Sequence, residues 1–233
     1  AAYPDRLASY TENELVWKDG TRMPLGSADA RRPFAEMLER GTIREQFAIP
    51  YPLAVAPFRP PATDEDPGRI RNEAFFLKMY GDCRRGEVTA KLRSVAWLPR
   101  HGGGSVRATT VNGVADQLEK VSRDLDALPG DMIRYLIPTS GIYNCRPIAG
   151  TDRLSVHAYG AAIDINAGFG DYWRWAKQPG GAPAWRNRIP REIVEIFERH
   201  GFIWGGRWYH FDSLHFEYRP ELIALAKRGW PRE

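Results

Sequence analysis

Hydrophobic and polar positions form short, distinct patterns along the first part of the chain. The stretch ELVWKDGTRMPL alternates and then turns at Asp19-Gly20, which predicts a β-hairpin. The stretch DARRPFAEMLER has apolar residues at helical spacing and is followed by Gly41, which predicts a helix. Residues 48–68 are rich in proline and end in an acidic stretch, a composition typical of an irregular connector.

Helical and extended patterns then follow one another without a regular order. The spacing of apolar residues predicts helices over 67–81, 112–128, 189–202 and 220–229, and extended segments over 87–99, 132–150, 161–166 and 213–218. No βαβ rhythm and no internal repeat is present, so the order of elements favours an α+β fold with a small antiparallel sheet flanked by helices. We expect the connector to divide an N-terminal extension, 1–66, from a main domain, 67–233.

Two of the predicted strands place polar groups on one face. In AAIDIN the isoleucines share a face, which leaves Asp164 on the opposite one. In DSLHFEY the apolar residues share a face in the same way, which leaves His215 and Glu217 opposite. If the two strands are neighbours, Asp164 and His215 point to the same side of the sheet. Groups of this kind are costly to bury unless they bind something.

The composition is that of an ordinary globular protein. The chain has 233 residues, of which 43% are hydrophobic and 27% charged, with a formal net charge of +4. A chain of this length can bury roughly 70–75% of its unfolded surface, so disorder is not indicated. The basic residues are scattered rather than clustered, which argues against a nucleic-acid partner. No apolar run approaches the roughly 20 residues that cross a membrane, so no integral membrane segment is expected.

The first residues and the cysteines bear on the compartment. The chain starts AAYPDRL, without methionine, which suits a bacterial periplasmic or secreted protein whose signal peptide has been removed. Cys83 and Cys145 lie in separate segments and form no CxxC motif. A single disulfide in an oxidising compartment is the favoured interpretation, with two buried free thiols as the alternative.

Four residues stand out as candidates for chemistry: His157, Asp164, Asp212 and His215. Two imidazoles and one carboxylate are a common catalytic zinc set, which leaves a fourth position for water. Asp212 lies three residues before His215, outside the predicted strand, and is the candidate for the carboxylate that takes and passes on a proton. The alternative is that these side chains are simply hydrogen-bonded within the fold. The other histidines give weaker evidence of a catalytic role. His200 suits a helix C-terminus, and the glycine-rich loop after His101 is interpreted as a flexible connection.

The stretch SVHAYGAAID resembles the SxHxxGxAxD signature of the LAS zinc peptidases, the group of D-alanyl-D-alanine carboxypeptidases and L-alanyl-D-glutamate endopeptidases that cut peptidoglycan. DSLHFE resembles the second signature of that group, and the resemblance covers roughly residues 70–228. It implies that His157, Asp164 and His215 bind Zn²⁺ and that Asp212 is the general base. Carboxypeptidase-type members often have Glu where this chain has Asp212, which leaves the preferred bond open.

Further site residues follow from the same resemblance and from their neighbourhood. YNCRPIAGTDRLSVH resembles the family segment that places an arginine beside the zinc, so we assign Arg146 to the substrate carbonyl or carboxylate, with a surface arginine as the alternative. Ser155 is expected to contact the substrate or a zinc ligand, unless it only initiates a turn. Tyr159, Trp208 and His210 are expected to line the cleft, although aromatic residues near a sheet are often simply packed.

The resemblance therefore implies a zinc metallopeptidase that acts on peptidoglycan peptides, either stem peptides or cross-bridges. Two alternatives belong to other classes of protein. One is a non-catalytic zinc module, because hedgehog signalling domains resemble this fold and keep a His-Asp-His zinc set. The other is a cell-wall binding domain in which the catalytic site has decayed.

Overall fold

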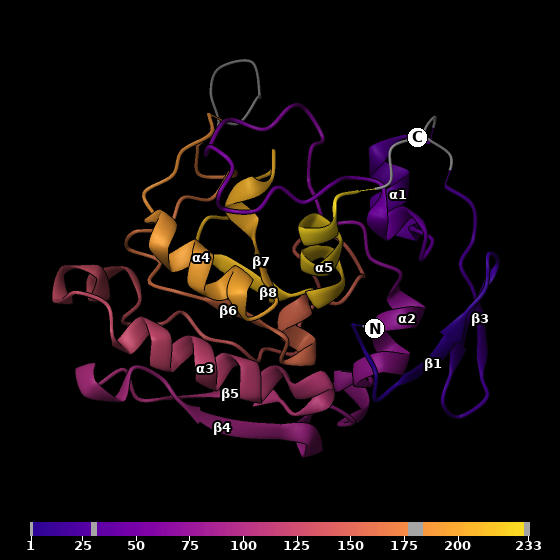
Figure 1. Cartoon of the computed structure of the whole chain (residues 1–233), viewed down its shortest axis with the longest axis horizontal. Helices are drawn as coiled ribbons and strands as arrows, with labels where there is room; N and C mark the ends of the chain where they lie inside the picture. The colour runs from indigo at the N-terminus through magenta and orange to yellow at the C-terminus, as the bar shows by residue number, and fades with distance from the viewer. Residues whose placement is uncertain (1, 29–31, 177–183, 231–233) are drawn as a thin grey trace.

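The computed structural model describes residues 2–28, 32–176 and 184–230 (Figure 1). The described chain is α+β, as predicted, with small antiparallel sheets and several helices. Its strands are β1 (Leu7–Tyr10), β2 (Glu14–Trp17), β3 (Arg22–Pro24), β4 (Leu92–Ala96), β5 (Ser105–Thr109), β6 (Ala162–Asp164), β7 (Phe202–Trp204) and β8 (His215–Tyr218). Its α-helices are α1 (Phe34–Arg40), α2 (Glu73–Tyr80), α3 (Val114–Asp126), α4 (Arg191–Arg199) and α5 (Pro220–Arg228). Among these residues no helix has both the length and the apolar character needed to cross a bilayer.

The sheet that carries the candidate residues has the order β6-β8-β7, with both pairs antiparallel. Helix α4 lies against it, and the ring of Phe197 on α4 stacks on Phe216 of β8 with 3.8 Å between the ring centres. Figure 1 shows α4 and α5 close to this sheet, with α3 and the β4–β5 hairpin below. Ile163 of β6 is fully buried, so the apolar face of the strand packs into the core as the alternation predicts.

The N-terminal residues form a separate sheet of order β1-β2-β3. The predicted hairpin is confirmed, because β2 and β3 pair antiparallel around Asp19-Gly20, where the Asp19 carboxylate accepts a hydrogen bond from the Thr21 N–H at 2.9 Å. Helix α1 begins at Phe34, and residues 29–31 of the helix predicted there lie outside the described residues. Trp17 and Phe75 pack together, so this sheet shares one hydrophobic core with the rest of the chain.

The proline-rich connector is irregular, as predicted, and is tied to the main body by two buried charged side chains. Glu198 on α4 accepts hydrogen bonds from the Tyr51 hydroxyl and the Ala54 N–H, both at 2.7 Å. Arg207, in the 3-10 helix η8 (Gly205–Arg207), donates to the carbonyl oxygens of Leu53, Ala56 and Pro57. The connector therefore has a fixed path across the domain.

Three predicted elements are wrong in extent or type. The extended segment predicted over 87–99 is a strand only in β4, because a 3-10 helix over Thr89–Lys91 precedes it. The helix predicted over 67–81 begins at Glu73, because the Asn72 side chain caps it by accepting from the Phe75 N–H, and 67–72 stay irregular. The extended segment predicted over 132–150 is instead the end of a 3-10 helix, η6 (Gly130–Tyr135), followed by irregular chain. Here the Asn166 amide donates to the carbonyls of Arg134 and Ile137, so a side chain satisfies backbone groups that a strand would have paired.

The glycine-rich loop after His101 is the turn of a hairpin rather than a flexible connection. Strands β4 and β5 pair antiparallel from Leu92–Thr109 to Ala96–Ser105 around it, and the Trp97 N–H donates to the Gly104 carbonyl. Gly102 and Gly104 have φ of 70° and 77°, values that favour glycine. Strand β5 was not predicted, because the glycine-rich loop before it was interpreted as a flexible connection and not as a hairpin turn.

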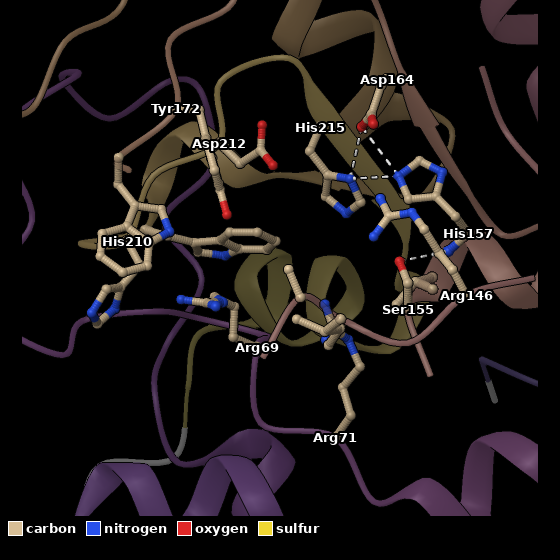
Figure 2. Close-up of a pocket in the computed structure, with 15 residues that line it drawn as sticks. Arg69, Arg71, Arg146, Ser155, His157, Asp164, Tyr172, His210, Asp212 and His215 are labelled. Carbon is tan, nitrogen blue, oxygen red and sulfur yellow. Dashed lines mark hydrogen bonds and ion pairs between the residues drawn. The ribbon is translucent and has the colours of Figure 1, made fainter. Parts of the chain in front are cut away.

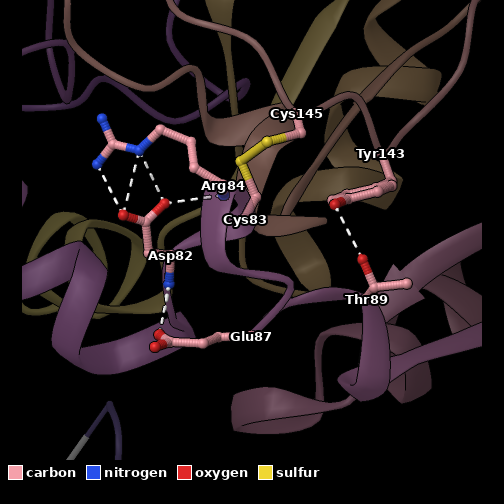
Figure 3. Close-up of a disulfide and its surroundings, with 7 residues drawn as sticks. All are labelled: Asp82, Cys83, Arg84, Glu87, Thr89, Tyr143 and Cys145. Atoms are coloured by element: carbon pink, nitrogen blue, oxygen red, sulfur yellow. Dashed lines mark hydrogen bonds and ion pairs between the residues drawn. A yellow bond between two sulfur atoms is a disulfide. The ribbon is translucent and has the colours of Figure 1, made fainter.

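The two cysteines form the predicted disulfide (Figure 3). It joins Cys83, at the start of the 3-10 helix η2 (Cys83–Arg85), to Cys145, 62 residues along the chain. The Asp82 carboxylate caps η2 by accepting from the Arg84 N–H at 2.9 Å. Because Arg146 follows Cys145 directly, the disulfide anchors the segment that carries this candidate site residue.

Candidate metal centre

Three of the candidate side chains meet at one point (Figure 2). Nε2 of His157 lies 3.1 Å from Nδ1 of His215 and 3.2 Å from Oδ1 of Asp164, and Nδ1 of His215 lies 2.9 Å from the same oxygen. Ligand atoms around a tetrahedral zinc ion lie about 3.3 Å from one another at normal bond lengths. The spacing of the three atoms is therefore close to that of three zinc ligands.

The outer contacts of the two imidazoles determine which nitrogens face the cluster. Nδ1 of His157 lies 2.6 Å from the Ile142 carbonyl oxygen, to which it donates, so Nε2 carries the lone pair. Nε2 of His215 lies 3.3 Å from Oε2 of Glu217, which leaves Nδ1 facing inwards. Two lone pairs and a carboxylate oxygen thus point at one another. This arrangement fits a cation, and the outer partners are those that orient metal-binding histidines.

His157 reaches the cluster from a short 3-10 helix, η7 (Val156–Tyr159), directly before β6. Ser155 caps η7, its hydroxyl oxygen accepting from the His157 N–H at 3.4 Å, so its observed contact is that of a turn-initiating serine. Gly160 ends η7 with φ of 67°, and a Cβ there would lie 2.7 Å from Leu92 Cδ2. The small residue between the two ligand positions is therefore required for close packing.

Glu217 is fully buried behind His215 and belongs to a charged network. Its carboxylate forms ion pairs with Arg71 and with Arg219. Burial alone would raise the pKa of Glu217, but the charges of Arg71 and Arg219 and the hydrogen bond from His215 hold it well below its usual range. The carboxylate therefore stays ionised and holds the ring of His215 in place.

Without a metal ion, the same network favours a proton on the cluster. Burial would lower the pKa of His215, but its hydrogen bonds to Asp164 and Glu217 outweigh burial and raise it to about 10. The pKa of Asp164 is held low by both histidines despite burial. The cluster thus has a strong demand for positive charge, which a divalent cation satisfies in place of the proton.

Asp212 lies beside the cluster and has a free carboxylate oxygen. Its backbone N–H donates to the Gly205 carbonyl at 3.0 Å, and its carbonyl accepts from the His215 N–H at 3.1 Å, which fixes the turn before β8. Its Oδ1 is buried and has no hydrogen-bond partner among the described residues. Burial, together with the negative charge of Asp164, raises the pKa of Asp212 to about 6. A carboxyl group in this range is suited to accept and return a proton near neutral pH.

A cavity of about 130 Å³ opens in front of these residues. Of the residues predicted from the sequence, Arg146, Ser155, Trp208 and His210 line it together with Asp212 and the three clustered side chains. Tyr159 does not line this cavity. Its ring packs against Phe76 and Tyr80 in the core, at 5.7 Å between ring centres in each case, because η7 turns it away from the sheet face that carries the cluster.

The cavity also contains residues that the sequence pattern did not single out. They are Arg69, Arg71, Ile148, Ala149, Val156, Tyr172 and Trp173. The two arginines lie in the segment that was predicted to be helical, and Tyr172 and Trp173 follow β6 without a periodic pattern. Glu217 lies behind the cavity and does not line it, and the sequence pattern had already placed it on the strand face of His215.

Residues 149–218 match the family model described as D-alanyl-D-alanine carboxypeptidase. The predicted family resemblance is confirmed over this segment, and the match does not extend to residues 70–148. The matched segment of this peptidase family contains His157, Asp164, Asp212 and His215, while Arg146 lies just before it. No curated protein and no solved structure matches the chain.

Proposed function

We propose that the protein is a zinc-dependent peptidase that hydrolyses amide bonds in the stem peptides or cross-bridges of peptidoglycan. The observation that carries the proposal is the convergence of three acceptor atoms, from His157, Asp164 and His215, beside the free carboxylate oxygen of Asp212. The match of residues 149–218 to a peptidase family supports peptide hydrolysis, and the description of that family supports peptidoglycan as the substrate.

The three clustered side chains would hold the zinc ion, with Glu217 and the Ile142 carbonyl orienting the two imidazoles. A bound zinc ion supplies a Lewis acid that polarises a carbonyl and acidifies a water molecule. Asp212 takes the proton of the attacking water onto its free oxygen and then gives it to the departing amine. Its pKa of about 6 allows both transfers near neutral pH.

Besides Asp212, Arg146 is the second side chain that we assign to the reaction. Its side chain is exposed in the cavity and lies beside His157 in Figure 2. The only hydrogen bond that the Arg146 side chain makes to the described residues is a long one of 3.5 Å to the Pro147 carbonyl. The guanidinium is therefore available to donate to the substrate carbonyl oxygen as negative charge develops there.

A periplasmic or secreted location belongs to the same proposal. The Cys83–Cys145 disulfide supports it, because structural disulfides persist in oxidising compartments. Peptidoglycan is built in such a compartment, so the location and the substrate agree.

The second candidate is a zinc-containing module of hedgehog-like fold that binds the cell wall without cutting it. The free carboxylate of Asp212 favours the enzyme, because a module that only binds has no use for a buried, unpaired base. Incubation with purified muropeptides, analysed by mass spectrometry, separates the two. The enzyme produces new peptide termini that disappear with a chelator and in Asp212→Asn, whereas binding without new termini would support the module.

A further inference from the structure

Arg69 is held rigidly at the edge of the cavity by a buried carboxylate. Its Nη1 donates to Oδ2 of Asp66 at 2.8 Å, and its guanidinium lies over the ring of Trp208, 5.5 Å from the ring centre. Asp66 is itself completely buried and also accepts from the backbone N–H of His210 at 2.9 Å and lies 2.6 Å from its ring Nδ1. The side chain of Asp66, near the end of the connector, thus holds both Arg69 and His210 in place.

The guanidinium of Arg69 retains unused hydrogen-bond donors. It has five N–H groups, and within the described chain its side chain donates only to Asp66. Its side chain is 19% exposed and lines the cavity. The remaining donors are therefore available to a ligand in the cavity.

Arg69 and Arg146 lie at different ends of this cavity. Figure 2 shows Arg69 on the side of Asp212 and Tyr172, whereas Arg146 lies beside His157 and Ser155. In the proposed mechanism Asp212 protonates the departing amine, so the leaving amino acid occupies the side of the cavity on which Arg69 lies.

We propose that Arg69 binds the free carboxylate of the leaving amino acid, the one on the same carbon as the departing amine. This inference rests on the proposed function. Peptidoglycan contains three kinds of leaving group with such a carboxylate. They are a C-terminal D-alanine, a cross-linked diaminopimelate that leaves through the amine of its D-configured carbon, and a D-glutamate that is linked onwards through its γ-carboxyl group. An internal bond of an ordinary peptide has an uncharged amide there instead.

A fixed guanidinium distinguishes these two kinds of leaving group. It can bind a carboxylate through two parallel charged hydrogen bonds, whereas an amide offers one neutral oxygen. Loss of a hydrogen bond to a charged group corresponds to a factor of about ten to one hundred. Arg69 would therefore determine that the enzyme prefers scissile bonds next to a free carboxylate.

The test compares a stem peptide ending in D-alanyl-D-alanine with the same peptide ending in a carboxamide. The wild-type protein should cleave the acid with a kcat/KM about ten- to a hundredfold higher. This ratio should fall towards one in Arg69→Gln and Arg69→Ala and stay intermediate in Arg69→Lys. Arg146→Ala should slow both substrates and keep the ratio, and Arg93→Ala, on the distant strand β4, should match the wild type.

The outcomes separate this inference from the proposed function. If the wild-type protein cleaves neither peptide, nor any muropeptide, the proposed function fails. If it cleaves them and the Arg69 variants keep the wild-type ratio of kcat/KM between the acid and the carboxamide, Arg69 does not bind the carboxylate. If the Arg69 variants do not fold, inhibition of the wild type by free D-alanine is compared with that by D-alaninamide, and equal inhibition overturns the inference. Muropeptides in which the carboxylate of diaminopimelate or of glutamate is amidated identify the leaving group that Arg69 binds, because only amidation of that group should slow cleavage by the wild-type protein.

Discussion

Asp164 and His215 are direct partners across strands β6 and β8, with Oδ1 of the aspartate 2.9 Å from Nδ1 of the histidine. The register of this one strand pair therefore brings two of the three candidate ligands together. A slip of one residue would turn one of the two side chains into the core. Ile163 and Phe216, fully buried on the opposite face, hold that register.

The contact between Glu217 and His215 predicts a role in zinc affinity. Glu217→Gln keeps the size of the side chain but removes the charge that orients the imidazole. We expect zinc affinity to fall about 10- to 100-fold, measured by competition with a chromophoric chelator. Glu119→Gln, an exposed carboxylate on α3, is the matched control. Unchanged affinity in Glu217→Gln would show that the contact does not orient the ligand.

The free oxygen of Asp212 predicts that this side chain is needed for the reaction and not for the metal. In Asp212→Asn, kcat should fall about 10²- to 10⁴-fold while the protein still binds one zinc ion. In the wild type, protonation of the base should reduce kcat/KM as the pH falls below about 6. Metal analysis and a pH profile measure both effects. Wild-type kcat in Asp212→Asn would mean that another group is the base.

The disulfide predicts a large contribution to stability. Cys83 and Cys145 close a loop of about 60 residues, for which chain entropy predicts about 4 kcal/mol. Urea denaturation of the double variant Cys83→Ser/Cys145→Ser should show a loss of this order relative to the oxidised protein. Equal unfolding midpoints would mean that other contacts already fix the segment before Arg146.

Glu198 predicts that stability decreases towards alkaline pH. Burial raises its pKa to about 7, although the hydrogen bonds from Ala54 and Tyr51 and the charge of Arg207 oppose this. Between about pH 4.5 and 7 the folded protein therefore holds a proton that the unfolded chain has lost. The free energy of unfolding should be greatest at the acidic end of this window and fall by about 3 kcal/mol as the pH rises through 7.

The matched variant for that prediction is Glu198→Gln, which cannot ionise. Its unfolding free energy, measured in urea at several pH values, should lack the part of the pH dependence that Glu198 contributes. Parallel curves for the variant and the wild type would show that Glu198 titrates normally.

The meeting of Asp164 and His215 was predictable from the sequence because their strands are regular. Alternation along β6 and β8 indicated which face Asp164 and His215 occupy, and the motif spacing brought in His157 and Asp212. The disulfide was also predictable, since the chain has only two cysteines.

Other parts of the site were not predictable because long-range contacts place them. Asp66 and Arg69 lie in irregular chain that is held by residues far along the sequence. The ring N–H of Trp208 donates to the Pro67 carbonyl and Nη1 of Arg219 donates to the Gly68 carbonyl, from 141 and 151 positions away. Tyr159 was expected in the cleft, but the aromatic rings of Phe76 and Tyr80 hold it in the core. No local pattern carries this information. The division at residue 66 stays a prediction, although the N-terminal residues share the hydrophobic core of the rest.

The most direct test of the zinc peptidase proposal is a titration of the metal-free protein with zinc, following metal occupancy and muropeptide cleavage in the same samples. New peptide termini should appear in proportion to bound zinc and reach a plateau at one ion per chain. His215→Ala should bind no zinc at this site and cleave nothing. Full cleavage by the metal-free protein, or a zinc-saturated protein that releases no termini, would contradict the proposal.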